Sequence, residues 1–303
     1  MKTLSEPDLY PALRPNRRIA PETERKQAQF LVWGWVLTVL PMAILLAVVQ
    51  TTIAWQDGRM LSAIEMQGTY LCIVLACLVL ELRAATPAAA AVGGVICLTM
   101  TFATSYSSVR LTETLLPALV TLFVLTFAAT RIGHANKVKL GLAESKHGRA
   151  VNQIVANLGA ASGVAMMHTV MSSSLPACIA MLAEATADTM ASELGPLLPG
   201  RTLLLTNLKR VPRGTDGGVS VGGTLCGLAG AAAVTIVGMR SLTLEWNATM
   251  VAFLGAVTGF VVDSILGATL ESRGYIGNDM VNFLSTVTAG IVSISAGLAI
   301  GLS

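Results

Sequence analysis

Nine long apolar segments constrain this chain more than any other feature of its sequence. Most are near the roughly 20 residues that a helix needs to cross a bilayer. Of the 303 residues only 12% are charged, whereas soluble proteins carry about 25%. We therefore predict an all-α, polytopic bundle of transmembrane helices. The predicted spans are residues 29–54, 61–80, 85–106, 112–130, 151–171, 175–195, 218–239, 246–269 and 279–301.

Polarity divides the chain into three parts. Residues 1–29 form a polar tail with four prolines and six lysines or arginines, and no short apolar region with a small-residue cleavage site follows these charges. Residues 30–131 hold four chemically plain spans, which we expect to pack and to shape a lipid-facing groove. Residues 132–303 hold five spans with basic loops, and we expect this part to be the catalytic half.

Positive charges are distributed unevenly between alternate loops. With a cytosolic amino terminus, only Arg59, Arg110 and Arg240 of the 20 lysines and arginines lie in outside loops. Cytoplasmic loops of membrane proteins carry an excess of these residues. The distribution therefore predicts a cytosolic amino terminus and supports the count of nine spans. The acidic residues of the tail favour a prokaryotic plasma membrane as the location.

Three carboxylates interrupt the sixth apolar segment, namely Glu184, Asp188 and Glu193. Ionisable groups inside a membrane are costly and mark functional sites. Glu184 and Asp188 are four residues apart, so they share one helical face and repel each other unless a cation lies between them. We interpret this pair as part of a divalent-metal site.

Polar clusters also occur in the neighbouring spans, always at the predicted cytosolic end. Scattered packing polar residues would not select one end in five consecutive spans. We therefore expect one site in the inner leaflet, open to the cytosol. The other clusters are Asn152, Gln153 and Asn157, then Gly217, Gly218 and Ser220, then Asp263, Ser264 and Glu271, and finally Asn278, Asp279 and Asn282.

The loop between the sixth and seventh spans supplies the opposite charge. Its basic residues precede a glycine-rich turn that is expected to open a helix, without the spacing of a Walker A motif. Glycines let backbone N–H groups approach an anion, and a helix start favours negative charge. The predicted phosphate-binding residues are Lys209, Arg210, Arg213, Gly214, Thr215, Asp216, Gly217, Gly218 and Ser220.

Carboxylates beside a phosphate-binding loop predict a complex of Mg²⁺ with a nucleoside triphosphate. Mg²⁺ is usually held by one or two carboxylates together with substrate phosphates. Phosphoryl transfer depends mainly on positioning and charge neutralisation, so no catalytic histidine is required. We expect His134, His147 and His168 to be non-catalytic.

Five blocks of sequence carry a resemblance to a known family. They are Glu144-Ser-Lys-His-Gly-Arg149 with Asn152-Gln153 and Ala156-Asn157, Ala185-Thr-Ala-Asp188-Thr-Met-Ala-Ser-Glu193-Leu-Gly, Lys209 to Ser220, Asp263-Ser-Ile-Leu-Gly-Ala-Thr, and Asn278-Asp279-Met-Val-Asn282-Phe. These blocks resemble the membrane family named domain of unknown function 92, which includes transmembrane-protein-19-like members and the plant phytyl-phosphate kinase. The resemblance is specific from about residue 83 to the end.

The resemblance implies a kinase that acts on an isoprenyl monophosphate such as phytyl phosphate, with CTP favoured over ATP as donor. The acceptor would lie in the membrane with its phosphate at the site. Under this hypothesis the Mg²⁺ ligands are Asp188 and Asp263, completed by Glu184 or Asp279. Catalysis would depend on Asp188, Asp263, Lys209 and Arg213. The substrate or the metal ligands would be oriented by Asn152, Gln153, Asn157, Asn278 and Asn282.

Other functions remain open from the sequence. An isoprenoid-alcohol kinase or a lipid cytidylyltransferase would need a general base, for which Asp188 or Asp263 could serve. An ion-coupled transporter usually binds its substrate at the midplane between repeats, and no repeat is visible here. A lipid-binding or scaffolding membrane protein would show no turnover. No nucleic-acid partner is expected, and homo-oligomerisation is left open.

Overall fold

The structure is a computed structural model that describes residues 19–56, 63–105, 110–142 and 148–302. The start of the polar tail, Arg59 and His147 lie outside the described residues. The chain is 78% helical with little strand, and five described helices are long and apolar enough to cross a membrane. It is therefore a helical membrane protein, while the count of nine spans and the cytosolic amino terminus stay predictions. The five helical segments are Pro21–Ile53, Pro87–Ser105, Val221–Ser241, Trp246–Glu271 and Asn278–Ala299.

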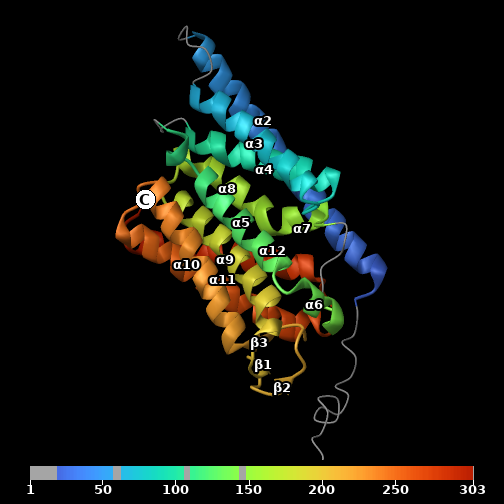
Figure 1. The fold of residues 1–303 in the computed structure, drawn as a ribbon. Helices are drawn as coiled ribbons and strands as arrows, with labels where there is room; N and C mark the ends of the chain where they lie inside the picture. Colours follow the sequence, from blue (N-terminus) through green and yellow to red (C-terminus); the bar gives the residue numbers. More distant parts are fainter. Residues whose placement is uncertain (1–18, 57–62, 106–109, 143–147, 303) are drawn as a thin grey trace, which may run out of the picture.

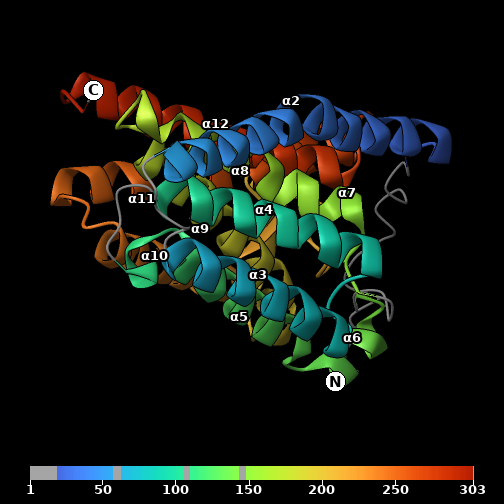
Figure 2. The same cartoon turned by 90° about the horizontal axis from the view of Figure 1, so that it is seen from above.

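The helices follow the predicted apolar segments and lie side by side in one bundle (Figures 1 and 2). A further apolar helix, α5, is shorter than the five candidate spans. The α-helices are α2 (Pro21–Gln56), α3 (Ala63–Glu81), α4 (Pro87–Ser105), α5 (Leu116–Arg131), α6 (His134–Leu140), α7 (Val151–Ile154), α8 (Ala160–Met166), α9 (Ser174–Leu194), α10 (Val221–Ser241), α11 (Trp246–Leu266) and α12 (Asn278–Ala299). Two π-helical segments, η2 (Val155–Gly159) and η5 (Gly267–Glu271), continue α7 and α11.

Helix α9 forms the centre of the bundle and packs against α5, α8, α10, α11 and α12. Every one of its residues from Ser174 to Ala187 is buried. Its neighbours approach closely because they present glycines: a Cβ added at Gly227 would lie 2.8 Å from the Ala187 carbonyl oxygen. One added at Gly259 would lie 2.8 Å from Glu184 Cγ. Such close approach is typical of membrane helices, where small residues let neighbouring backbones meet.

Contacts at one end of the bundle join segments that are distant in sequence. The backbone N–H of Arg149, before α7, donates to the Ala84 carbonyl between α3 and α4 (2.9 Å). The Asn152 amide in α7 donates to the Asp279 carboxylate in α12. The amide of Gln27 in α2 donates to a carbonyl that precedes α12. The polar ends of these helices therefore meet at the same end of the molecule.

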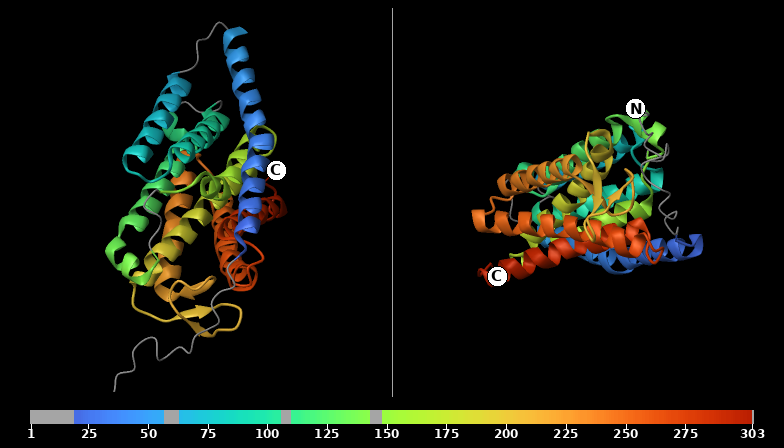
Figure 3. Two further views of the ribbon diagram at one scale, coloured as in Figure 1. Left: turned by 90° about the vertical axis from the view of Figure 1, so that its right-hand side faces the viewer. Right: turned by 90° about the horizontal axis from the view of Figure 1, so that it is seen from below.

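A small antiparallel sheet that the sequence did not predict covers this end of the otherwise helical bundle (Figures 1 and 3). It consists of β1 (Thr202–Leu204), β2 (Arg210–Val211) and β3 (Gly218–Ser220), in the order β2-β1-β3. The seventh predicted span begins at residue 218, but α10 begins only at Val221. Ser220 is extended and its hydroxyl accepts from the backbone N–H of Gly223 (3.1 Å), which caps the helix there.

The segment after α5 is also more ordered than the predicted loop. Residues 134–140 form α6, and Gly141 ends it in the left-handed conformation. Lys137 in this helix is 1% exposed, and its ammonium donates to the carbonyls of Ala129 (2.9 Å) and Thr130 (2.7 Å). The same ammonium binds the carboxylate of Glu193 at the end of α9. Helix α6 is thereby fixed against the central helix.

Candidate functional site

The deepest acidic group of the candidate site is Glu184, in the middle of α9. Its side chain is 1% exposed, and its Oε2 accepts a hydrogen bond from the Thr286 hydroxyl of α12 (2.7 Å). Its Oε1 has no hydrogen-bond partner among the described residues. A buried carboxylate oxygen without a partner is costly. Glu184 therefore has one carboxylate oxygen whose hydrogen-bonding capacity no described residue fills, although the side chain does not line the acidic pocket described next.

Asp188 and Asp263 line one pocket of about 200 Å³ at the end of the bundle that carries the sheet. Asp188 lies one helical turn beyond Glu184 in α9, and Asp263 lies near the end of α11. The carboxyl groups of Asp188, Glu184 and Glu271 are close enough to repel Asp263 electrostatically. Asp263 Oδ2 is buried and has no hydrogen-bond partner in the described part of the chain. The site thus gathers negative charge from three elements.

The glycine-rich segment, residues 213–220, also lines this pocket. Gly217 has a φ of +68°, and a Cβ there would lie 2.1 Å from the backbone nitrogen of Ala268 and 2.4 Å from the carbonyl oxygen of Ser264. Only glycine fits a left-handed position so close to another backbone. Gly217 therefore fixes the segment against the end of α11, beside Asp263.

Arg213 is the basic residue that this segment brings into the pocket. Its Nη1 donates to the Pro196 carbonyl oxygen (2.8 Å), which anchors the side chain at the end of α9. The residues that line the pocket include four carboxylates, Asp188, Asp216, Asp263 and Glu271, and among its described lining residues Arg213 alone is basic. The pocket is therefore strongly acidic, apart from one fixed guanidinium.

Several polar groups of the predicted phosphate-binding loop form hydrogen bonds within the loop itself. The hydroxyl of Ser220 caps α10, as described above. The Thr215 hydroxyl donates to the Pro212 carbonyl (2.8 Å), and the Gly218 N–H donates to the Thr215 carbonyl (2.8 Å). These bonds stabilise the turn that carries Arg213 and Gly217 into the pocket.

The other two predicted phosphate-binding cations lie elsewhere. Lys209 and Arg210 are exposed and do not line the pocket. The physical reason is the order of the sheet, because β1 lies between β2, which contains Arg210, and β3, which leads into α10. The sequence from Lys209 to Ser220 was predicted to be one basic loop. In the structure Arg210, near its start, lies in the edge strand β2, away from the pocket.

The predicted amides fall into two groups. Asn278, at the start of α12, lines the pocket, whereas Asn282, one turn later, does not. Asn152 donates to Asp279, so a predicted amide holds a predicted metal ligand. The bond orients the Asp279 carboxylate from the side of α7.

Gln153 and Asn157 form hydrogen bonds within their own helical segment. Gln153 Oε1 accepts from the Ala150 backbone N–H (2.8 Å), and Asn157 Nδ2 donates to the Gln153 carbonyl (2.8 Å). Asn157 lies in η2, where the helix widens beside α12. These bonds satisfy the backbone where α7 begins and where its hydrogen-bonding pattern changes.

Two charged residues of the site had no assigned role in the sequence. Glu271, in η5, lines the pocket. Arg149 Nη2 donates to the Thr189 hydroxyl (3.4 Å), and the guanidinium attracts the Asp188 carboxylate. Arg149 belongs to the first family-like block, three residues before Asn152. Glu271 follows the fourth block and lies eight residues after Asp263. Both residues are charged and lie next to the end of a predicted span, and this position could have marked them as candidates for the site.

The donor set fits Mg²⁺ held jointly with a substrate. In the described part of the chain, no three His, Cys, Asp or Glu side chains are arranged to hold a metal by themselves. Mg²⁺ usually takes one or two carboxylates and completes its shell with water and substrate phosphates. Glu184 and Asp263 each have one oxygen without a hydrogen-bond partner among the described residues, and the carboxylates around Asp263 repel it. Such oxygens are suitable for binding a divalent cation.

The comparisons with known proteins agree with this membrane architecture. A family model described as integral membrane protein DUF92 matches residues 70–290. An uncharacterized membrane protein of Methanocaldococcus jannaschii is 34% identical over 116 residues, which cover 38% of this chain and 48% of that protein. An uncharacterized membrane protein of Synechocystis is 30% identical over 182 residues, or 57% of this chain and 69% of that protein.

A plant protein is more distantly similar. Protein VTE6, chloroplastic, of Arabidopsis thaliana is 28% identical over 183 residues, which cover 57% of this chain and 55% of the plant protein. The chain thus spans about half the length of the archaeal and plant relatives that it matches. No solved structure matches the chain.

Proposed function

Because the chain belongs to the integral membrane protein DUF92 family, we propose that it is a membrane phosphotransferase that converts an isoprenyl monophosphate, such as phytyl phosphate, into the diphosphate. The donor is a nucleoside triphosphate, with CTP favoured. One observation carries the proposal: Asp188, Asp263 and Arg213 line the same pocket at one end of an apolar bundle. The acceptor class comes from the resemblance to the family of the plant phytyl-phosphate kinase.

The charge of the pocket supports a metal-dependent reaction. Four carboxylates and one arginine line it, so a polyphosphate would be repelled if it entered alone. Mg²⁺ bound between the carboxylates and the phosphates would neutralise both sets of oxygens. Asp188 and Asp263, which both line the pocket, are the proposed ligands from α9 and α11, and substrate phosphates and water would complete the shell. Glu184 and Asp279, the other two predicted ligands, do not line the pocket.

The size of the pocket indicates which part of the nucleotide it holds. At about 200 Å³ it is smaller than the roughly 300–1,000 Å³ of sites that enclose whole small molecules. We place the terminal phosphates in the pocket, and the nucleoside over the sheet outside. Arg213 is positioned to bind these phosphates.

The proposed reaction needs no strong base. An oxygen of the acceptor monophosphate attacks the terminal phosphorus of the nucleoside triphosphate, a new P–O–P bond forms, and the nucleoside diphosphate leaves with the electrons of the broken P–O bond. A phosphate monoester has a second pKa of about 6, so its attacking oxygen is already largely ionised near neutral pH. The carboxylates would position the cation, and the positive charges of the cation and of Arg213 would neutralise the phosphates, which together would supply the catalysis.

The experiment that tests this function is a phosphoryl-transfer assay on protein purified in detergent. Labelled CTP and ATP are offered with phytyl monophosphate and, separately, with phytol. Formation of the diphosphate, dependent on Mg²⁺, is the expected result. Phosphorylation of phytol alone would replace the proposal with an alcohol kinase, and transfer of a cytidylyl group would replace it with a cytidylyltransferase. Absence of transfer with every donor and acceptor would contradict the proposed phosphotransferase function.

We place the pocket on the cytosolic side, because the predicted cytosolic loops carry the basic residues. Thr206 lies exposed in the turn between β1 and β2. A membrane-impermeant maleimide should label Thr206→Cys in inside-out vesicles and not in sealed right-side-out vesicles. The unmodified protein is the control for its own cysteines. The reverse labelling pattern would contradict the orientation.

A further inference from the structure

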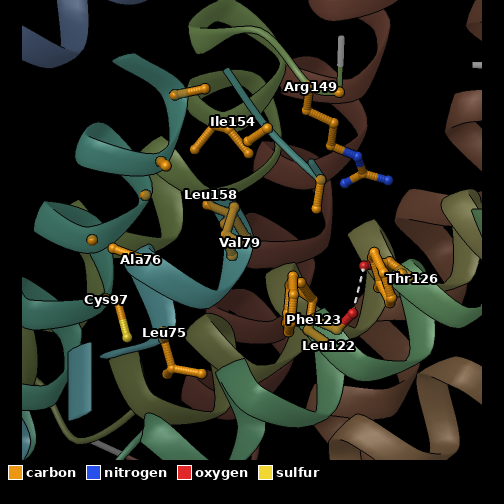
Figure 4. Close-up of a pocket in the computed structure, with 18 of the residues that line it drawn as sticks. Leu75, Ala76, Val79, Cys97, Leu122, Phe123, Thr126, Arg149, Ile154 and Leu158 are labelled. Atoms are coloured by element: carbon orange, nitrogen blue, oxygen red, sulfur yellow. Dashed lines mark hydrogen bonds between the residues drawn. The ribbon is translucent and has the colours of Figure 1, made fainter. Parts of the chain in front are cut away.

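A second pocket, of about 450 Å³, lies between α3, α4, α5 and the segment from α7 to η2. It is more than twice the volume of the acidic pocket. Figure 4 shows side chains from several helices directed into it. Most of the lining is aliphatic or aromatic and includes Leu75, Val79, Leu122, Phe123, Ile154 and Leu158.

One end of this apolar pocket is basic. Arg83, Arg131, His134 and Arg149 line it together with the backbone of residues 84 and 85. A short parallel bridge between Ala85 and Arg149 joins the segment before α4 to the segment before α7 at this end, with the Arg149 N–H donating to the Ala84 carbonyl. Side chains from the end of α3, the end of α5 and the start of α7 thus converge there.

Contacts within the fold hold the Arg131 side chain in place. Arg131 donates from Nη2 to the Leu82 carbonyl, and its guanidinium lies 4.9 Å from the centre of the Phe127 ring. Cation–π contact and hydrogen bonding restrict the side chain to the mouth of the pocket. A positive mouth on an apolar pocket complements a ligand with one anionic head and a hydrocarbon chain.

Arg149 lies between this pocket and the carboxylates of α9. It lines the apolar pocket (Figure 4). Its guanidinium also donates to Thr189 and attracts the carboxylate of Asp188, a residue that lines the acidic pocket. A phosphate held by Arg149 would therefore lie on the side of the apolar pocket nearest to the carboxylates. This is the position that an attacking phosphate needs.

We propose that the apolar pocket binds the hydrocarbon chain of the acceptor, a linear isoprenyl monophosphate, with its phosphate held by Arg83, Arg131 and Arg149. The acceptor's identity rests on the proposed function, whereas the site itself rests on the shape and charge of this pocket. Its volume falls within the roughly 300–1,000 Å³ range of small-molecule sites. Because lipid is as apolar as the pocket, selection of the chain depends on fit rather than on hydrophobicity.

The first test fills the pocket and measures binding without turnover. A Cβ at Gly93 meets only Ile154 Cγ2, at 3.8 Å, so Gly93→Leu would extend a side chain into the pocket. Gly34→Leu in α2 is the matched control, because nothing lies within 4 Å of a Cβ there. Gly93→Leu should weaken binding of labelled phytyl monophosphate roughly tenfold, by overfilling the pocket, while Gly34→Leu leaves it unchanged. Gly93→Ala gives a graded version should the larger side chain prevent folding.

The second test separates the phosphate from the chain. Arg149→Gln removes one positive charge at the mouth and should weaken phytyl monophosphate binding about tenfold or more. Binding of phytol, which has the same chain and no phosphate, should change less than twofold. Equal losses for both ligands would show a general structural defect and overturn the assignment of Arg149.

The outcomes distinguish this inference from the proposed function. Unchanged binding in Gly93→Leu and Gly93→Ala overturns the pocket assignment, even where the kinase assay succeeds. Displacement of the label by phosphatidylglycerol as readily as by unlabelled phytyl monophosphate would also overturn it, in favour of a bilayer phospholipid site. Binding that depends on Gly93 and Arg149, with no phosphoryl transfer from any donor, would support the pocket and contradict the kinase.

Discussion

The two pockets of this protein are lined by residues of opposite character, and Arg149 of the apolar pocket contacts α9 beside Asp188 of the acidic pocket. The acidic pocket is lined by carboxylates, glycines and one arginine, and the apolar pocket by aliphatic and aromatic side chains with arginines at its mouth. Charged side chains are costly inside a membrane, so they are usually retained there only where they have a function. In the proposed reaction the pockets would therefore divide the labour: the acidic pocket would hold the cation that neutralises the donor's phosphates, and the apolar pocket would select the acceptor by shape.

The largest effect should come from removing charge in the acidic pocket. Asp188→Asn keeps the shape of the side chain and removes a negative charge that attracts Arg149. If the pocket holds Mg²⁺ between carboxylates and phosphates, turnover should fall on the order of 1,000-fold, and the Mg²⁺ concentration needed for half-maximal activity should rise. Steady-state transfer assays over a Mg²⁺ titration measure both quantities.

A matched control keeps this result specific. Glu245→Gln removes one exposed carboxylate charge at the start of α11, at the other end of that helix from Asp263. Its activity should equal that of the unmodified protein. The division of labour fails if Asp188→Asn retains normal turnover, or if it instead loses binding of phytyl monophosphate in the absence of nucleotide.

The sequence predicted the acidic pocket far better than the apolar one, for a physical reason. Carboxylates, glycines and arginines in a membrane segment are unusual, so Asp188, Asp263 and Gly217 were visible one at a time. Leu75, Phe123 and Leu158 are ordinary in such segments. Their shared pocket depends on how α3, α5 and η2 pack against one another, which no single residue reveals.

The predictions at the ends of the helices were wrong for a similar reason, because contacts with distant residues determine the structure there. Gly218 to Ser220 were predicted to begin a helix, but pairing with β1 makes them a strand, and the cap at Ser220 delays α10. Lys137 was predicted as one more cytosolic loop charge, yet it is buried against Glu193. Both depend on partners distant in sequence. The long apolar helices needed no such partners and were predicted well.

The ion pair between Lys137 and Glu193 tests whether the two regions are mechanically joined. Helix α6 follows α5, which lines the apolar pocket, and Glu193 belongs to the helix that carries Asp188. Lys137→Met leaves a partly buried carboxylate without its cation and should destabilise the fold by about 3 kcal/mol. Denaturant or detergent unfolding measures this loss.

The exposed pair of Lys26 and Glu22 in α2 provides the comparison. Lys26→Met should cost less than about 1 kcal/mol, because water already solvates both charges. A double variant, Lys137→Met with Glu193→Gln, should recover part of the stability lost in the single variant. Equal effects at the buried and exposed pairs would show that the contact does not join the two regions.

Alanine substitutions at two glycines can separate the energetic cost of backbone strain from the cost of a steric clash. Gly217 and Gly141 have nearly the same φ, +68° and +71°, but a Cβ would clash with α11 at Gly217 and meet nothing within 4 Å at Gly141. Gly141→Ala should cost about 1 kcal/mol from strain alone. Gly217→Ala should cost about 2 kcal/mol more, since the segment must move away from Ser264 and Ala268. Thermal unfolding of both variants measures the difference, and equal losses would contradict the close approach.

The smallest expected effect distinguishes the arginine inside the acidic pocket from the one at the edge of the sheet. Arg213→Gln removes the pocket's guanidinium and should raise the KM for the nucleotide about tenfold, with little change in the KM for phytyl monophosphate. Arg210→Gln, on the exposed edge strand β2, should change either KM less than twofold. Because the KM values for donor and acceptor are measured on the same protein, the outcome assigns Arg213 to one pocket. A rise in the acceptor's KM instead would place the acceptor phosphate in the acidic pocket and remove the distinction between the two regions.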